Sequence, residues 1–186
     1  MLAALGATLL GGCTGGTRCP ALPDGLHYCL QDSAAVTPFD AFQSIHVEGP
    51  GIDLRLIAAL EVDRDGMRMV GLTPMGQRVL ETVFDNHTLR TSIVGDEGGV
   101  DAGALLALVQ LALWPAQAVR AGLPAAWQLD ETDGLRRVLR DDGRTELDIA
   151  RTGTASRWTA IDLSLPAAGL RVRVRDLEAT TDGMAR

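Results

Sequence analysis

Aromatic residues, positive charge and long apolar runs are all scarce in this chain of 186 residues. Phe, Trp and Tyr make up 4% of it, which offers little for stacking on sugars or unpaired bases. Acidic residues outnumber basic ones by 24 to 17, for a net charge of −7, whereas nucleic-acid binding needs a basic face. We therefore expect no nucleic-acid partner. No body segment reaches the about 18 apolar residues that a spanning helix needs.

The sequence also lacks the common patterns of catalytic and metal sites. His27, His46 and His87 lie far apart, so no helical pair of metal ligands is available. No Gly-x-Ser-x-Gly, Cys-x-x-Cys or glycine-rich nucleotide-binding motif is present. Five acids fall at expected turns, where Asp supports turn geometry: Asp63, Asp65, Asp85, Asp141 and Asp142. We therefore expect no metal, no cofactor and no enzymatic activity.

The N-terminus carries a pattern of its own. A short apolar segment, 2–12, precedes Cys13, and the residues before that cysteine are Leu10, Gly11 and Gly12. This is the lipobox order, in which the thiol accepts diacylglycerol and small residues admit the signal peptidase. We predict a signal peptide over 1–12 and lipidation of Cys13, although no Arg or Lys precedes the apolar segment. The alternative is a buried apolar helix with an incidental cysteine.

Lipidation predicts where the chain resides. Two or three acyl chains hold a protein firmly to a bilayer, whereas one chain anchors it only marginally. Thr14, not Asp, follows the cysteine, and by the sorting rule of enteric lipoproteins this favours the periplasmic face of the outer membrane, with the inner membrane as the alternative. Residues 13–25 are then the lipidated N-terminus and a tether. In that oxidising compartment Cys19 and Cys29 form either a disulfide or two separate thiols.

Period-two alternation dominates the body of the chain. Six apolar residues from Ile52 to Val62 share one face, and Asp65-Gly66 marks the hairpin turn that follows. The segment 170–176 alternates between an apolar face and an arginine face, which we interpret as solvated. The expected strands are 42–47, 52–62, 67–72, 77–84, 88–94, 135–140, 145–151, 158–165 and 170–176.

One helical block divides these strands. Residues 101–113 are rich in Ala and Leu, Asp101 can cap the first turn, and Pro115 ends or kinks the helix. A second short helix is expected over 116–121. Only Gln110 is polar between Ala102 and Trp114, so the helix must be buried on most sides or face something apolar. It is either a plain crossover helix or the cover of a lipid cavity, and the fold class is α+β.

The order of these features resembles a known family. The carrying residues are the lipobox, the segment from Gly71 to Arg78, the strand ending near Asn86, and the helix end Gln110-Leu111-Ala112-Leu113-Trp114-Pro115. Together they resemble the uncharacterised lipoproteins of aryl polyene biosynthesis gene clusters, which are distantly similar to the lipoprotein carriers LolA and LolB. The resemblance covers roughly residues 26 to 178, and we assign the lipid-binding domain to 26–180.

This resemblance implies an incomplete barrel built from a curved antiparallel sheet, with the helical insertion as a lid over an apolar cavity. The expected partner is an acyl-chain lipid or a lipoprotein. The residues expected to line the cavity are Leu54, Leu56, Leu60, Met69, Leu105, Leu108, Leu111 and Trp114. Met75, in the turn 73–76, is the expected membrane- or cargo-facing tip.

Three functional hypotheses follow from the sequence. The first is an anchored module that binds acyl chains and assists transfer of a lipid or lipoprotein at the outer membrane. The second is a scaffold lipoprotein with a filled core that organises a membrane-associated biosynthetic complex. The third, an acyl-transferring or acyl-hydrolysing enzyme, is the least favoured because no nucleophile constellation is present.

Overall fold

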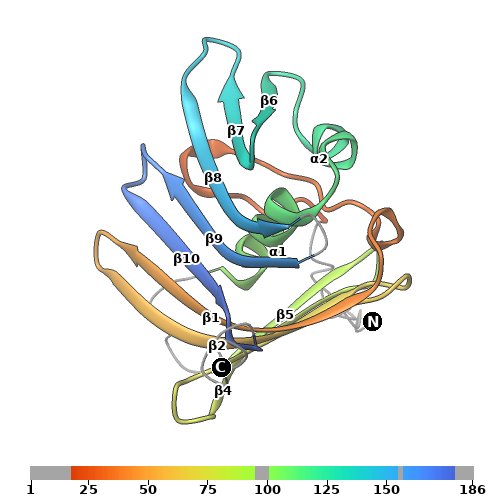
Figure 1. The fold of residues 1–186 in the computed structure, drawn as a ribbon, viewed down its shortest axis with the longest axis vertical. Helices are drawn as coiled ribbons and strands as arrows, with labels where there is room; N and C mark the ends of the chain where they lie inside the picture. The colour runs from red at the N-terminus through yellow and green to blue at the C-terminus, as the bar shows by residue number, and fades with distance from the viewer. Residues whose placement is uncertain (1–17, 95–100, 155–156, 179–186) are drawn as a thin grey trace, which may run out of the picture.

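The computed structural model describes residues 18–94, 101–154 and 157–178. They form one ten-stranded sheet in which every neighbouring pair is antiparallel, in the order β5-β4-β3-β2-β1-β10-β9-β8-β7-β6. The sheet curves around the helix α1 (Figure 1). Among the described residues, the edge strands β5 and β6 do not pair with each other, so the barrel is open. This confirms the expected curved, incomplete barrel.

The strands fall in two runs separated by the helices. The first run is β1 (Phe39–Gly49), β2 (Ile52–Val62), β3 (Met67–Leu72), β4 (Arg78–Phe84) and β5 (Leu89–Ile93). The helices α1 (Ala102–Leu113) and α2 (Ala116–Gly122) follow. The second run is β6 (Trp127–Thr132), β7 (Leu135–Arg140), β8 (Thr145–Thr154), β9 (Arg157–Leu165) and β10 (Leu170–Asp176). Pairing of β1 with β10 joins the two runs into one sheet.

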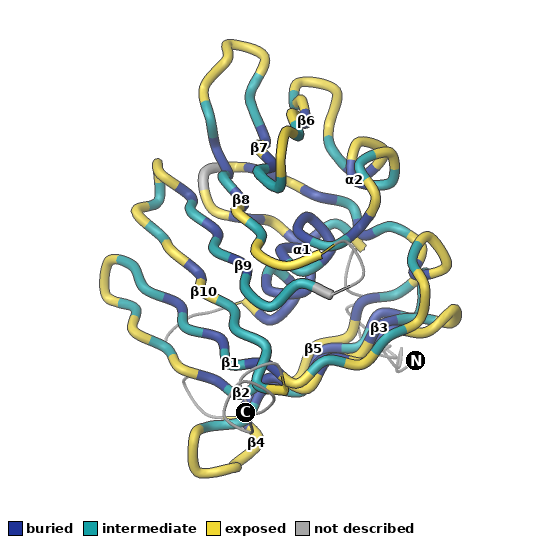
Figure 2. The backbone as a smooth tube through the Cα atoms, viewed as in Figure 1, coloured by how far each residue is buried: buried dark blue, intermediate teal, exposed yellow. Residues whose placement is uncertain are grey.

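Alternation sets which face of each strand meets the core. In β2 the residues from Leu56 to Val62 are buried at every second position, as the sequence predicted. In β10, Val172 is buried, while Arg171 and Arg173 are exposed on the other face. Buried positions alternate with half-buried or exposed ones along much of the sheet (Figure 2).

The strand β6 was not expected from the sequence. Its inward positions are Trp127, Leu129 and Glu131, so the alternation breaks off at a carboxylate. It turns into β7 through Asp133 and Gly134, both with positive φ, which is the backbone geometry of a tight hairpin.

The helix α1 lies inside the curve of the sheet (Figure 1). Asp101 caps it by accepting hydrogen bonds from the backbone N–H groups of Gly103 and Ala104, at 2.7 and 3.4 Å. The helix ends at Leu113, with Trp114 as its C-cap before Pro115, as predicted. Nine of its twelve residues are buried, so the sheet alone does not account for its surroundings.

An N-terminal strap, residues 18–36, covers the side of α1 that faces away from the sheet. The side-chain amide of Gln110 in α1 accepts a 2.7 Å hydrogen bond from the Gln31 backbone N–H and donates to the Gln31 carbonyl at 2.8 Å. Trp114 Nε1 donates to the Asp32 carbonyl. A disulfide joins Cys19 to Cys29 within the strap. Residues 19–25, assigned above to the tether, therefore pack on the domain, and Leu22 is buried.

The strap also packs closely against α2. The backbone N–H of Cys29 donates to the carbonyl of Gly122, the last residue of α2. A Cβ on Gly122 would lie 2.5 Å from the Cys29 carbonyl oxygen, so a larger residue would push the strap away. Across the described ranges, neither helix has the length and apolar character needed to cross a membrane.

Candidate functional site: the groove beneath the central helix and its arginine clamp

The concave face of the sheet is occupied by α1. A narrow groove remains between α1 and strands β1, β3, β9 and β10, and all of its lining residues except Gln43 are apolar. Val109, Leu113 and Val174 on its lining are half-buried. Its volume is about 30 Å³, against roughly 300–1,000 Å³ for sites that hold small ligands. In this conformation the groove can admit water but not an acyl chain.

The expected cavity residues are only partly brought together. Met69, Leu105 and Leu108 line the groove. The others lie in the surrounding core without lining it: Leu56, Leu60, Leu111 and Trp114 are buried, and Leu54 is half-buried. Trp114 lies on the strap side of the helix. Residues missed by the sequence reasoning complete the groove, notably Ile161, Leu163 and Val172 of the second strand run.

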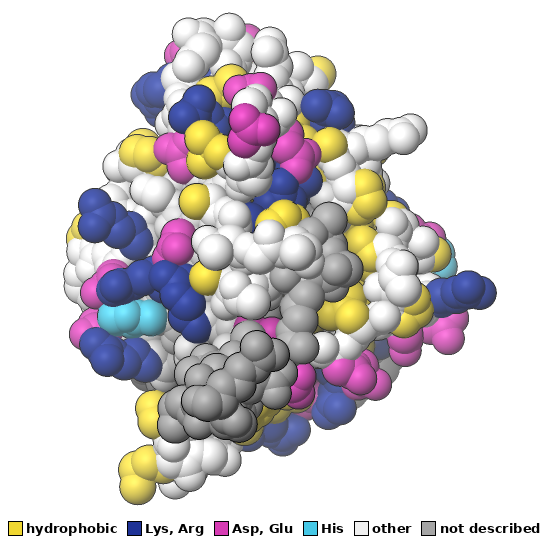
Figure 3. Space-filling view, viewed as in Figure 1, with side chains coloured by type: hydrophobic (Ala, Val, Ile, Leu, Met, Phe, Trp, Pro, Cys, Tyr) yellow, Lys and Arg dark blue, Asp and Glu magenta, His cyan; other side chains and the backbone are white. Residues whose placement is uncertain are grey.

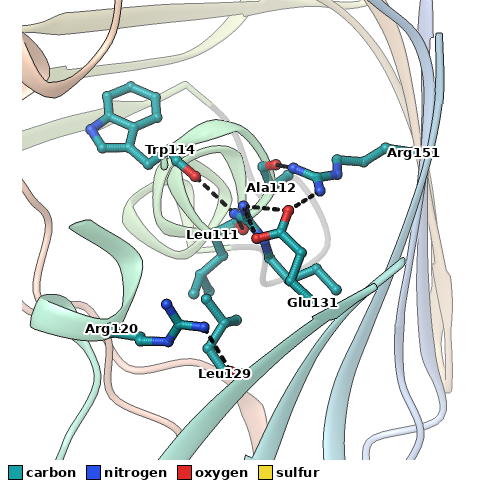
Figure 4. A network of polar contacts seen from close by, with 8 residues as sticks. Leu111, Ala112, Trp114, Arg120, Leu129, Glu131 and Arg151 are labelled. Carbon is teal, nitrogen blue, oxygen red and sulfur yellow. Dashed lines mark hydrogen bonds and ion pairs between the residues drawn. The ribbon is translucent and has the colours of Figure 1, made fainter. Parts of the chain in front are cut away.

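Two arginines from the sheet hold the C-terminal end of α1 (Figure 4). Arg136 of β7 donates from Nη1 to the carbonyl oxygens of Leu111 at 2.6 Å and Trp114 at 2.9 Å. Arg151 of β8 donates to the carbonyl of Ala112 at 3.2 Å. These carbonyls belong to the last turn, where the carbonyl oxygens find no N–H donors within the helix and lie at the negative end of its dipole.

One carboxylate ties the two arginines together. Glu131 of β6 pairs with Nη2 of Arg136 at 3.0 Å and also with Nη2 of Arg151. We call Glu131, Arg136 and Arg151 the clamp. The Arg136 side chain is 2% exposed and that of Arg151 is 7% exposed. Arg151 also stacks on the Trp158 ring, with its Cζ 4.8 Å from the ring centroid, which adds a cation–π contact.

The clamp changes the protonation equilibria of its members. Burial opposes ionisation of Glu131, but hydrogen bonds and charge from Arg151 and Arg136 outweigh it and hold the pKa of Glu131 below its usual range. Burial lowers the pKa of Arg136, and the neighbouring positive charge of Arg151 lowers it further, while Glu131 opposes both effects. A guanidinium stays charged nonetheless, so two buried cations share one anion.

A β-bulge adds a second polar group to the inner face of β7 and β8. Val138 pairs with Leu147 and Leu139 with Thr145, which leaves Glu146 as the extra residue. Glu146 and Leu147 are consequently both buried. The Glu146 carboxylate pairs with Arg140 at 3.1 Å and Arg144 at 2.8 Å, and Arg140 stacks on Trp127. The buried residues of β6–β8 therefore include charged side chains among aliphatic ones.

A larger hollow, of about 500 Å³, lies on the opposite, outer face of β7–β10 and β1. Arginine, acidic and histidine side chains gather over β1 and β10 on this side (Figure 3). Arg173 pairs with Glu48, and His46 Nε2 lies 2.7 Å from Asp53 Oδ1. This charged, open lining is unsuited to acyl chains, and it agrees with the expected solvated arginine face.

The remaining expected site residues lie away from the groove or outside the described residues. Met75 forms the tip of the β3–β4 hairpin and is 89% exposed. The Gly76 N–H donates to the Thr73 carbonyl at 2.8 Å, which closes the expected turn. Cys13 and the signal segment 1–12 lie outside the described residues. Within the described ranges, no three His, Cys, Asp or Glu residues are placed to hold a metal ion.

The described residues thus combine an apolar groove with a nearly buried clamp of two arginines and one carboxylate. A family model described as a protein of unknown function (DUF3261) matches residues 40–178, which is well over half of the chain. No curated protein matches it. The matched region contains all ten strands except the start of β1, both helices and the complete clamp. The chain is therefore a member of the DUF3261 family.

Proposed function

We propose that this protein binds acyl chains between its curved sheet and α1, and assists the transfer or insertion of a lipid or lipoprotein at the outer membrane. The observation that carries the proposal is the aliphatic groove beneath α1, which is narrow but open at half-buried Val109, Leu113 and Val174. Burial of an acyl chain against such a lining supplies affinity at roughly 25 cal/mol per Å² without polar recognition.

Binding requires α1 to move, because the helix occupies the volume that a ligand would need. Two of its properties suit it to that role. Its side chains are apolar on nearly every side, so it can repack against an acyl chain as readily as against the sheet. Among the described residues, the polar contacts between it and the strap or sheet come from Gln110 and from its last turn.

The cellular setting rests on the N-terminal sequence. Lipidated Cys13 would hold the domain at the periplasmic face of the outer membrane, and only residues 14–17 separate it from the strap. The strap covers α1, so the anchor is attached close to the element that must move. Exposed Met75 is then the membrane- or cargo-facing tip. The resemblance to aryl polyene cluster lipoproteins and to LolA and LolB suggests an aryl polyene lipid or a lipoprotein as cargo.

The test measures uptake of a neutral apolar probe, N-phenyl-1-naphthylamine, by the full chain carrying Cys13→Ser. We expect saturable fluorescence enhancement and lipid adducts in native mass spectrometry. Ala112→Leu would add volume within the groove and should lower uptake, whereas Ala118→Leu, at a half-buried site on α2 outside the groove, should not. Absence of uptake in both assays, with circular dichroism showing a folded chain, would rule out the proposal.

The close packing of α1 against the sheet favours a second candidate, a scaffold lipoprotein with a filled core. Its supporting observation is the small volume of the groove, about 30 Å³, which is that of a packed interior rather than a binding site. A scaffold would take up no probe, and would bring down a defined protein from membranes in cross-linking experiments. Probe uptake that is lowered by Ala112→Leu but not by Ala118→Leu would exclude this candidate.

A further inference from the structure

We infer that the ligand is an amphiphile with an anionic head group, and that Arg136 and Arg151 bind this head group once α1 has moved. The inference rests on the proposed function and deepens it, because it names the chemical class of the ligand. It applies equally to a fatty-acid carboxylate and a phospholipid phosphate, which share a negative charge at the end of an acyl chain.

The clamp carries an excess of positive charge that α1 itself compensates. Arg136 and Arg151 share the single carboxylate of Glu131. Their other hydrogen bonds go to the carbonyls of Leu111, Ala112 and Trp114, at the negative end of the α1 dipole. The Nε atoms of both arginines are buried and have no hydrogen-bond partner among the described residues. The clamp therefore has more hydrogen-bond donors than are used while α1 occupies its present position.

The clamp is also continuous with the apolar groove. Arg151 lies beside Ile161 in the register of β8 and β9, and Ile161 lines the groove. Arg151 also donates to the carbonyl of Ala112, another lining residue. An acyl chain placed in the groove would thus end at a buried guanidinium, with its head group where the last turn of α1 now lies.

If α1 moves away, an anion is the ligand that best replaces its carbonyl groups at the clamp. Without the helix carbonyls, two nearly buried guanidinium groups would face each other with one carboxylate between them, and an uncompensated buried charge is costly. A carboxylate or phosphate accepts paired hydrogen bonds from guanidinium and restores the charge balance. A hydroxyl or ammonium head group does neither. The closed helix and the anionic ligand therefore compete for the same donors.

The experiment compares head groups on one chain length in the full chain carrying Cys13→Ser. Decanoate, decyl phosphate, decanol and decyltrimethylammonium each displace N-phenyl-1-naphthylamine, and their dissociation constants are measured. We expect an anion to bind at least about tenfold more tightly than decanol, and the cation to bind most weakly. The order of decyl phosphate and decanoate then distinguishes a phospholipid-like from a fatty-acid-like cargo, and either order supports the inference.

Variants assign the preference to the clamp. Arg151→Gln should abolish the advantage of anions over decanol, while Arg171→Gln, an exposed arginine on the outer face, should leave it intact. In the unsubstituted clamp, the Nε–Hε resonances of Arg136 and Arg151 should reach different positions at saturation with decanoate and with decanol, because only decanoate replaces the helix carbonyls, so the assignment does not depend on a variant that folds poorly.

The outcomes separate the inference from the proposed function. Equal binding of all four amphiphiles would overturn the anionic head group and leave acyl-chain binding standing. An anion preference that survives Arg151→Gln, with no shift of the arginine resonances, would overturn the clamp as its site. Failure to bind any amphiphile or the probe would overturn the proposed function itself.

Discussion

The two halves of the sheet hold α1 in different ways. Strands β1, β3, β9 and β10 line the groove beside it with apolar side chains, apart from Gln43. Strands β6, β7 and β8 meet its last turn through Glu131, Arg136 and Arg151. Aliphatic packing is non-directional and tolerates sliding and repacking, whereas hydrogen bonds to charged donors fix one position. The apolar strands provide a surface along which α1 can move and repack. The strands of the clamp fix the position that its last turn occupies in this structure.

The largest expected effect lies in the polar half. Arg136→Ala removes a buried cation, leaves two helix carbonyls without this donor and leaves Glu131 with one arginine partner in place of two, so the free energy of unfolding should fall by about 4 kcal/mol. Urea unfolding followed by circular dichroism measures it. The exposed Arg171→Ala should change stability by less than about 0.5 kcal/mol. A loss below about 1 kcal/mol for Arg136→Ala would show that the clamp does not hold the helix.

A cavity in the aliphatic half should cost somewhat less. Leu108 is 6% exposed and packs over the groove, so Leu108→Ala should lower the free energy of unfolding by about 3 kcal/mol through lost burial and the cavity left behind. Half-buried Leu113 on the same helix is the control, and its replacement by Ala should cost less. Equal losses at the two positions would mean that the groove side of α1 is not packed as described.

The hydrogen bonds between the strap and α1 should contribute a smaller share. Gln110→Leu keeps the side chain similar in size but removes its amide, which leaves the backbone N–H and carbonyl of Gln31 without these partners. We expect a loss of about 2 kcal/mol in unfolding free energy, measured by the same urea titration. Hydrogen exchange should rise at the Gln31 amide while the amides of β7 keep their protection. Unchanged exchange at Gln31 would show that Gln110 does not secure the strap.

The pH dependence should show the smallest effect. The folded pKa of Glu131 lies below its usual range, so between the folded and unfolded values the unfolded chain binds more protons and stability rises with pH. This contribution is complete above the unfolded pKa of about 4.3 and is lost as pH falls through the folded pKa. Thermal melts should show a steeper loss below about pH 5 for the wild type than for Glu131→Gln. Identical slopes would contradict the pairing.

The sequence predicted the parts of the fold that follow from periodicity. The alternation over 52–62 and 170–176 and the Ala/Leu-rich segment after Asp101 correspond to β2, β10 and α1 with little change in their ends. These segments each have one dominant apolar pattern, and the Asp65-Gly66 turn after β2 supports its pairing with β3.

The clamp could not be predicted from periodicity. In β7 the apolar residues Leu135 and Leu139 are half-buried, and Arg136 is the one that points into the core with Val138. In β6 the inward positions are Trp127, Leu129 and Glu131. Glu131 breaks the apolar pattern, so the sequence did not indicate a strand there. A charged residue on the inner face is stable only because its partners come from distant elements, and a single sequence does not show those contacts. An arginine alternating with buried valine was the one available signal.

The sequence also did not predict how narrow the groove is. Leu105 and Leu108 fit a cavity lining and a packed core equally well, because both environments select aliphatic side chains. What decides between them is how closely the helix approaches the sheet, which depends on the strap and the clamp together.

The central claim is that α1 moves away from the sheet when an acyl chain binds between them. It is tested most directly by the distance between spin labels at Ala104→Cys on α1 and Ala150→Cys on the outer face of β8, in the full chain carrying Cys13→Ser with the Cys19–Cys29 disulfide intact. At a decanoate concentration that saturates probe displacement, we predict a second distance population that is absent without ligand. A distance distribution unchanged at saturation would show that α1 stays in place, and would contradict the account.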